Sequence, residues 1–121
     1  MCNLLMINSC MNSETILSAN THPGDSTTET VTGEKFKGDG YYGRSDGFHT
    51  VQYSYAGLTG TITIQGTLAT SPVDSDWFDV HTYTASQETA SKVANFTGNY
   101  VWIRSKVVYT DGTVNKIQLN H

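Results

Sequence analysis

The stretch that most constrains this chain is Asn99 to Tyr109, NYVWIRSKVVY, which alternates between two faces. One face is a mostly apolar row made of Val101, Ile103, Val107 and Tyr109. Strict alternation with β-branched and aromatic residues is typical of a strand that buries one face. An Asp-Gly step at residues 111–112 follows, and then a second apolar segment, Val114 to Leu119. The pattern predicts a closing hairpin with its turn at that Asp-Gly step.

The second face of the same strand is unusual for this chain. It carries Tyr100, Trp102, Arg104 and Lys106, which is the largest aromatic and cationic row on any predicted strand. We therefore predict that this row faces a partner. The alternative is that a loop covers it.

An adjacent antiparallel pair of strands is predicted in the middle of the chain. Phe48 to Ala56 alternates, and so does Thr61 to Ala69, with the short connection Gly57 to Gly60 between them. Such spacing favours a second hairpin. Gly66 inside the returning strand indicates a bulge or a close approach of another group to the backbone.

Further strand signals lie on either side of that pair. Trp77 to Thr84 alternates. Thr27 to Thr32 is β-prone but almost wholly polar, which favours an edge strand or a strand that pairs with another subunit. Lys35 to Gly47 is rich in glycine and predicts a long loop. Ala85 to Ala94 has some helical composition but no apolar stripe, so we predict a loop there, or a short strand around residues 93–96.

These segments add up to seven or eight strands and no convincing helix. With one polar face per strand, two sheets must pack apolar face to apolar face. We predict an all-β fold: a single-domain antiparallel β-sandwich of jelly-roll type at residues 22–121, with residues 1–21 as an extended N-terminal arm. The alternative fold is an up-and-down barrel. Met11 is an alternative natural start.

Composition narrows the possible partners. The chain has 121 residues, a net charge of −4 and seven scattered Lys and Arg residues. It therefore lacks the clustered basic surface of a nucleic-acid-binding protein. No apolar run is long enough for a membrane span, and the first residues lack the charged start of a signal peptide. Cys2 and Cys10 lie too near one end to brace a fold.

No arrangement of residues indicates a reaction. Asp74, Asp76 and Asp79 lie close in sequence, but their spacing matches no calcium motif, and solvated turn aspartates explain them better. The four histidines have no ligand spacing, and no nucleophile elbow or phosphate loop is present. We therefore predict a protein that is not an enzyme and has no metal site and no cofactor.

The aromatic residues are the better indication of function. We predict contacts to a partner or a glycan at six positions: Tyr41, Tyr42, Trp77, Tyr100, Trp102 and Arg104. Exposed aromatic rings stack on sugars and also anchor protein interfaces. The alternative for the two tryptophans is that they cap the ends of the core.

The segments GLTGTITIQGTLATSPVDSDWFDV and FTGNYVWIRSKVVYTDGTVNKIQLNH also support a resemblance. They resemble small structural proteins of T4-like tailed phages of marine bacteria, over residues 38–121. The resemblance implies a virion component with no catalytic residues, assembled in the host cytoplasm.

Two functional hypotheses follow from these observations. The first is a non-enzymatic virion structural protein of the capsid surface, neck, tail or baseplate, which binds other virion proteins and itself as a homo-oligomer. The second is a carbohydrate-binding β-sandwich module that uses its exposed aromatics. Both hypotheses are true at once if the protein decorates a virion and binds a glycan on the host surface.

Overall fold

The computed structural model describes residues 14–24, 27–41 and 47–120. These residues form seven strands and one short 3₁₀ turn, η2 (Asp74–Asp76). The strands are β1 (Glu14–Leu17), β2 (Asn20–Thr21), β3 (Glu29–Thr32), β4 (Phe36–Lys37), β5 (Phe48–Thr67), β6 (Phe78–Thr97) and β7 (Trp102–Asn120). Within the described ranges, no helix has the length and apolar character needed to cross a membrane.

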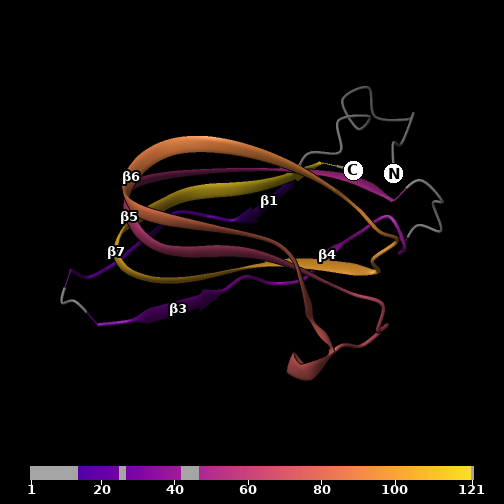
Figure 1. The fold of residues 1–121 in the computed structure, drawn as a ribbon. Coiled ribbons are helices and arrows are strands. Elements are labelled where there is room, and N and C mark those ends of the chain that lie inside the picture. Colours follow the sequence, from indigo (N-terminus) through magenta and orange to yellow (C-terminus); the bar gives the residue numbers. More distant parts are fainter. Residues whose placement is uncertain (1–13, 25–26, 42–46, 121) are drawn as a thin grey trace.

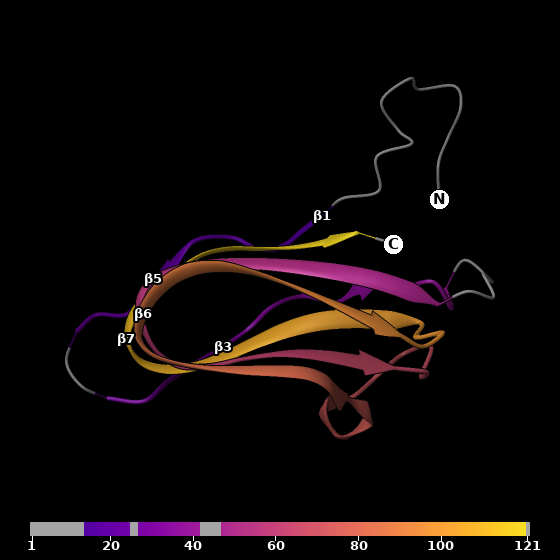
Figure 2. The ribbon, with the colours of Figure 1, turned by 45° about the horizontal axis from the view of Figure 1, so that its top comes forward.

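Three long strands, β5, β6 and β7, build both layers of the fold. Each runs along one layer, bends over at one end of the molecule and returns along the other (Figure 1). Turning the molecule shows the two layers facing each other with the bends stacked side by side (Figure 2). β5 lies in the middle and pairs antiparallel with β6 and with β7 over nearly its whole length. The predicted antiparallel β-sandwich is confirmed.

The two predicted hairpins are wrong in the same way. The strands predicted at residues 48–56 and 61–69 do not pair with each other, because residues 48–67 form the single strand β5 and pair with β6 and β7 instead. The Asp-Gly step at 111–112 likewise lies inside β7 rather than between two strands. Residues 85–94, expected as a loop or a short strand, continue β6.

The bends coincide with residues in the left-handed region of backbone space. Gly57 has φ 59°, Gln87 has φ 49° and Gly112 has φ 99°. A Cβ on Gly112 would lie 2.4 Å from the carbonyl oxygen of Gly57, so the strands approach closely where they bend. Glycine therefore serves at residues 57 and 112 as a bend in a continuous strand.

The remaining strands complete the layers along β7. β1 pairs with the second half of β7, while β3 and β4 pair with its first half. Within the described ranges β3 pairs only with β7, so the edge strand predicted at Thr27 to Thr32 is confirmed for Glu29–Thr32. At the opposite side of the sheet, β6 pairs with β5 and with no other described strand.

The core lies between the two layers and follows the alternation in the sequence. In the first half of β5, Val51, Tyr53 and Tyr55 are buried, and in its second half Ile62 and Ile64 are buried. The expected row of β7 is buried as well at Ile103, Val107 and Tyr109. Leu68, which belongs to the strand predicted at Thr61 to Ala69, lies past the end of β5 and is 69% exposed.

The described part of the expected N-terminal arm is built into the sheet. Glu14 pairs with Leu119, and Ile16 and Leu17 are 2% and 8% exposed. Residues 20–21 pair with residues 113–114 of β7. This segment therefore contributes Ile16 and Leu17 to the core, while Met11, Cys2 and Cys10 lie outside the described residues.

Candidate functional site

The outward face of the first half of β7 is the candidate site. Ile103, Ser105 and Val107 point into the sandwich and are buried. Trp102, Arg104 and Lys106 alternate with them and therefore point away from the core. All three are half-buried, and contact of this row with a partner stays a prediction.

Trp102 and Tyr41 form an aromatic pair on this face. Lys37 of β4 lies opposite Trp102, and the chain turns after it so that Tyr41 reaches the indole. The two ring centroids are 5.1 Å apart, with an angle of 57° between the rings. The indole N–H donates to the carbonyl oxygen of Thr70 at 2.9 Å, which fixes the orientation of the ring. Tyr41 is 45% exposed, as the sequence predicted.

Two lysines lie against these rings. The ammonium of Lys35 is 5.0 Å from the centroid of the Trp102 ring, and that of Lys37 is 4.6 Å from the centroid of the Tyr41 ring. Both lysines are exposed. We call the four residues Tyr41, Trp102, Lys35 and Lys37 the aromatic–lysine cluster.

Arg104 lies two residues after Trp102 on the same face of β7 and contacts several partners. Its guanidinium stacks 4.4 Å from the centroid of the Trp77 ring. Its Nε donates to Oε1 of Gln65 at 2.7 Å, and its Nη1 lies 3.6 Å from a carboxylate oxygen of Asp74. The amide of Gln65 in turn donates to Asp79 at 2.9 Å. Arg104 is therefore fixed in place and only 14% of its side chain is exposed.

The other predicted contacts are placed differently. Tyr100 precedes β7, so strand alternation does not apply to it, and its ring packs against the core near Phe96, with centroids 6.3 Å apart. It does not share the surface of Trp102. Neither tryptophan belongs to the buried core; both are partly exposed on the outer face. Tyr42 lies outside the described residues.

Gly66 explains where the Tyr100 ring goes. A Cβ on Gly66 would lie 2.7 Å from two carbons of that ring, and a Cβ on Gly98 would lie 2.4 Å from a third. The ring thus covers two glycines, and the close approach predicted at Gly66 is confirmed. Sequence reasoning could identify the glycine but not the residue that approaches it.

A polar cluster that the sequence did not reveal joins the two layers from inside. The Tyr53 hydroxyl, on the first half of β5, lies 3.0 Å from Nε2 of His81 on the first half of β6. Burial lowers the pKa of His81, which favours the neutral ring. A neutral imidazole nitrogen can accept a hydrogen bond from the Tyr53 hydroxyl. Tyr83 donates to Glu88 at 2.6 Å, and this hydrogen bond is the main cause of the lowered pKa of Glu88.

Burial also raises the pKa of the tyrosines in this cluster. Tyr53 and Tyr55 both have raised pKa values, first because of burial and then because of Tyr83 and Glu88. A phenol that resists ionisation is a poor nucleophile or base. The cluster stabilises the contact between the layers.

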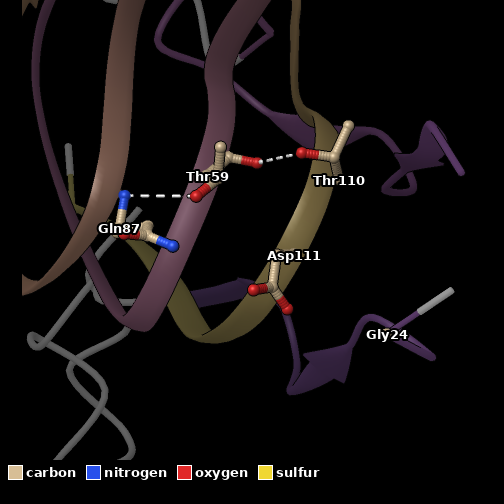
Figure 3. A pocket seen from close by; sticks show the side chains of 5 residues that line it. All are labelled: Gly24, Thr59, Gln87, Thr110 and Asp111. Carbon is tan, nitrogen blue, oxygen red and sulfur yellow. Dashed lines mark hydrogen bonds between the residues drawn. The ribbon is translucent and has the colours of Figure 1, made fainter. Parts of the chain in front are cut away.

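A shallow cavity of about 380 Å³ lies where the long strands bend (Figure 3). Its lining comes from β5, β6, β7 and the segment after β2: Gly24, Thr59, Gln87, Thr110 and Asp111. The Thr59 hydroxyl accepts the Gln87 backbone N–H at 3.1 Å, and the Thr110 hydroxyl donates to the Thr59 carbonyl at 3.4 Å. The cavity has no aromatic wall, so it offers no stacking surface.

The described residues contain no grouping of three or more His, Cys, Asp or Glu side chains that could hold a metal ion. The two buried histidines bind local groups. Nδ1 of His22 accepts the backbone N–H of Gly24 at 2.9 Å, while Nδ1 of His49 lies 2.9 Å from the carbonyl oxygen of Gly47.

No protein-family model and no curated protein matches the chain. Solved structures do match its fold. A family 29 carbohydrate-binding module from Piromyces equi is 10% identical, with a TM-score of 0.51 over 90% of both chains. PirA is 11% identical, with a TM-score of 0.51 over 91% of this chain and 94% of that one. The C-terminal family 6 carbohydrate-binding module of a marine laminarinase from Zobellia galactanivorans is 13% identical, with a TM-score of 0.48 over 91% and 100% of the two chains.

These similarities define the class of the molecule as an antiparallel β-sandwich. At such low identities they concern the fold alone, so any functional assignment depends on the site itself.

Proposed function

We propose that this protein binds carbohydrate on the outward face of β7, with Trp102 and Tyr41 as the stacking surface. One observation carries this proposal: two aromatic rings from distant segments meet on the solvent side of a sheet, and the Trp102 indole is oriented by its hydrogen bond to Thr70. Sugar rings present apolar C–H faces that stack on such rings, and fixed aromatics lose little entropy on binding.

The carbohydrate-binding modules with the same fold support this proposal, as a family 29 module does at a TM-score of 0.51. Fold similarity alone does not assign a ligand. The outward face of the opposite layer provides a useful contrast. It carries polar cross-strand pairs such as Thr50–Asn95, together with one exposed aromatic residue, Phe48.

A glycan array tests the proposal directly. We expect the wild-type protein to bind at least one class of saccharide, and Trp102→Ala to remove that binding while the protein remains folded. Phe48→Ala replaces an exposed aromatic on the other layer and serves as the matched control. The absence of any glycan binding by the wild-type protein would refute the proposal.

A second proposed function is self-assembly as a virion component, which the sequence resemblance suggested. Two features support it. β6 is a 20-residue strand that, among the described residues, pairs on one side only, and unpaired strand edges accept further strands. The connection from β5 to β6 also exposes Leu68 and Val73, and Phe78, the first residue of β6, is exposed next to it. Light scattering over a range of concentrations tests this function: a closed or filamentous oligomer is expected, and a strict monomer argues against it.

A further inference from the structure

The aromatic–lysine cluster places positive charge beside the stacking rings. Phe36 packs against the core, so the residues on either side of it, Lys35 and Lys37, point to the outer face. Their ammonium groups lie 5.0 Å and 4.6 Å from the centroids of the Trp102 and Tyr41 rings. Lys106 lies further along β7 on the same outward side as Trp102. Cations therefore gather on one face of a chain whose net charge is −4.

No carboxylate neutralises the two lysines of the cluster within the described residues. The ion pairs found there are Lys92 with Glu88 and Arg104 with Asp74. Lys35 and Lys37 contact aromatic rings instead, and such contacts at exposed sites contribute only about 0.5–1 kcal/mol each. Both side chains can therefore leave the rings when a stronger partner arrives.

We infer that the ligand of this surface is an acidic polysaccharide, whose sugar rings carry carboxylate or sulfate groups. This inference rests on the proposed carbohydrate-binding function and names its ligand class. A sugar ring stacks on Trp102 and Tyr41, and its anionic group takes the ammonium groups of Lys35 and Lys37. Each ammonium group thereby exchanges its contact with an aromatic ring for a hydrogen bond to a charged group. Hydrogen bonds between charged groups are shorter and stronger than neutral ones, so this exchange favours binding.

Arg104 has a different role from the lysines. Its guanidinium is already occupied by Trp77, Gln65 and Asp74, and only 14% of the side chain is exposed. Turning it toward a ligand would break these contacts. Arg104 therefore stays with its partners in the fold, and the two lysines supply the charge that the ligand meets.

The test uses two matched pairs of polysaccharides. Polygalacturonate is compared with its fully methyl-esterified form, and κ-carrageenan with agarose, so that each pair differs chiefly in charge. We expect the wild-type protein to bind the charged member of at least one pair about tenfold more tightly, and that preference to fall in about 0.5 M salt.

Variants assign the preference to the cluster. The double variant Lys35→Gln/Lys37→Gln should lose about tenfold in affinity for the charged member and bind the neutral member unchanged. Lys116→Gln is the matched control, because Lys116 is exposed on the second half of β7, in the other layer. Circular dichroism of each variant verifies that it is folded.

The outcomes separate this inference from the proposed function. Equal binding of both members of each pair, or binding only to neutral glycans, overturns the inference and leaves carbohydrate binding in place. A charge preference that survives the double lysine substitution overturns it too. Failure to bind any saccharide refutes the proposed function itself.

Discussion

Tyr41 and Trp102 place their ring centroids 5.1 Å apart, although Tyr41 follows β4 and Trp102 begins β7. The pair exists because β4 adds to the edge of β7, with Lys37 opposite Trp102. A turn after β4, in which the Tyr41 N–H donates to the Gly38 carbonyl at 3.1 Å, then brings the phenol ring toward the indole. The stacking surface therefore depends on strand pairing as well as on its two aromatic residues.

Gly66→Ala should destabilise the protein through Tyr100. The new methyl group would lie 2.7 Å from the Tyr100 ring, so the ring would have to leave its place against Gly66 and Gly98. Overpacking of this kind costs roughly 1–3 kcal/mol of the free energy of unfolding, measured by urea denaturation. The same substitution in a Tyr100→Ala background should cost much less. Equal costs in the two backgrounds would show that the ring is not the obstacle.

Gly112→Ala and Gly57→Ala should differ in cost, although both residues lie at the bends. Both have positive φ, which costs a non-glycine residue about 1–2 kcal/mol. A Cβ at Gly57 meets open space, whereas one at Gly112 would lie 2.4 Å from the Gly57 carbonyl oxygen. We therefore expect Gly112→Ala to lose at least twice as much free energy of unfolding as Gly57→Ala. Similar losses would mean that the bends are more open than the structure shows.

Arg104→Lys should destabilise the fold although it retains the charge. Lysine cannot keep both the stack on Trp77 and the hydrogen bond from Nε to Gln65. We expect a loss of roughly 1–2 kcal/mol in the free energy of unfolding, measured by chemical denaturation. Lys106→Gln, on the same strand and facing the same side, should change stability by less than about 0.5 kcal/mol. An Arg104→Lys protein as stable as wild type would show that this network contributes little to stability.

His81 should make the protein less stable as the pH falls below neutral. Burial lowers the pKa of His81 from its ordinary value of 6.5, so below that pH the unfolded chain binds a proton that the folded chain resists. Stability from this group is therefore complete above about pH 6.5 and decreases toward pH 5. His81→Gln retains an acceptor for the Tyr53 hydroxyl and does not titrate. The stability difference between wild type and variant should change with pH over this range, and a constant difference would contradict this.

The core could be predicted from the sequence because alternation depends only on local geometry. Val51, Tyr53 and Ile103 point inward as their period of two requires. The sequence indicates hairpins at Gly57 and Gly112 because glycine permits both a hairpin turn between two strands and a bend within one strand. The choice between them is made by distant strands: β5 finds partners in β6 and β7 along its whole length, and local sequence does not contain that information.

The candidate site was predictable in part for the same reason. Strand parity placed Trp102 and Arg104 on the outer face, and loop composition exposed Tyr41. The partners of Arg104 were not predictable, because Gln65 meets it only through the register of β5 against β7. Asp79 in turn reaches Gln65 only through the register of β5 against β6. Tyr100 was misplaced because the strand begins two residues after it.

The most direct test of the account is a calorimetric titration of the best-bound array glycan into wild type, Trp102→Ala and Phe48→Ala. Removing a central aromatic anchor costs about 2 kcal/mol of binding free energy, so we expect Trp102→Ala to bind about thirtyfold more weakly. Phe48→Ala should bind as wild type does. A folded Trp102→Ala protein that binds within about twofold of wild type would contradict the claim that this surface holds the sugar.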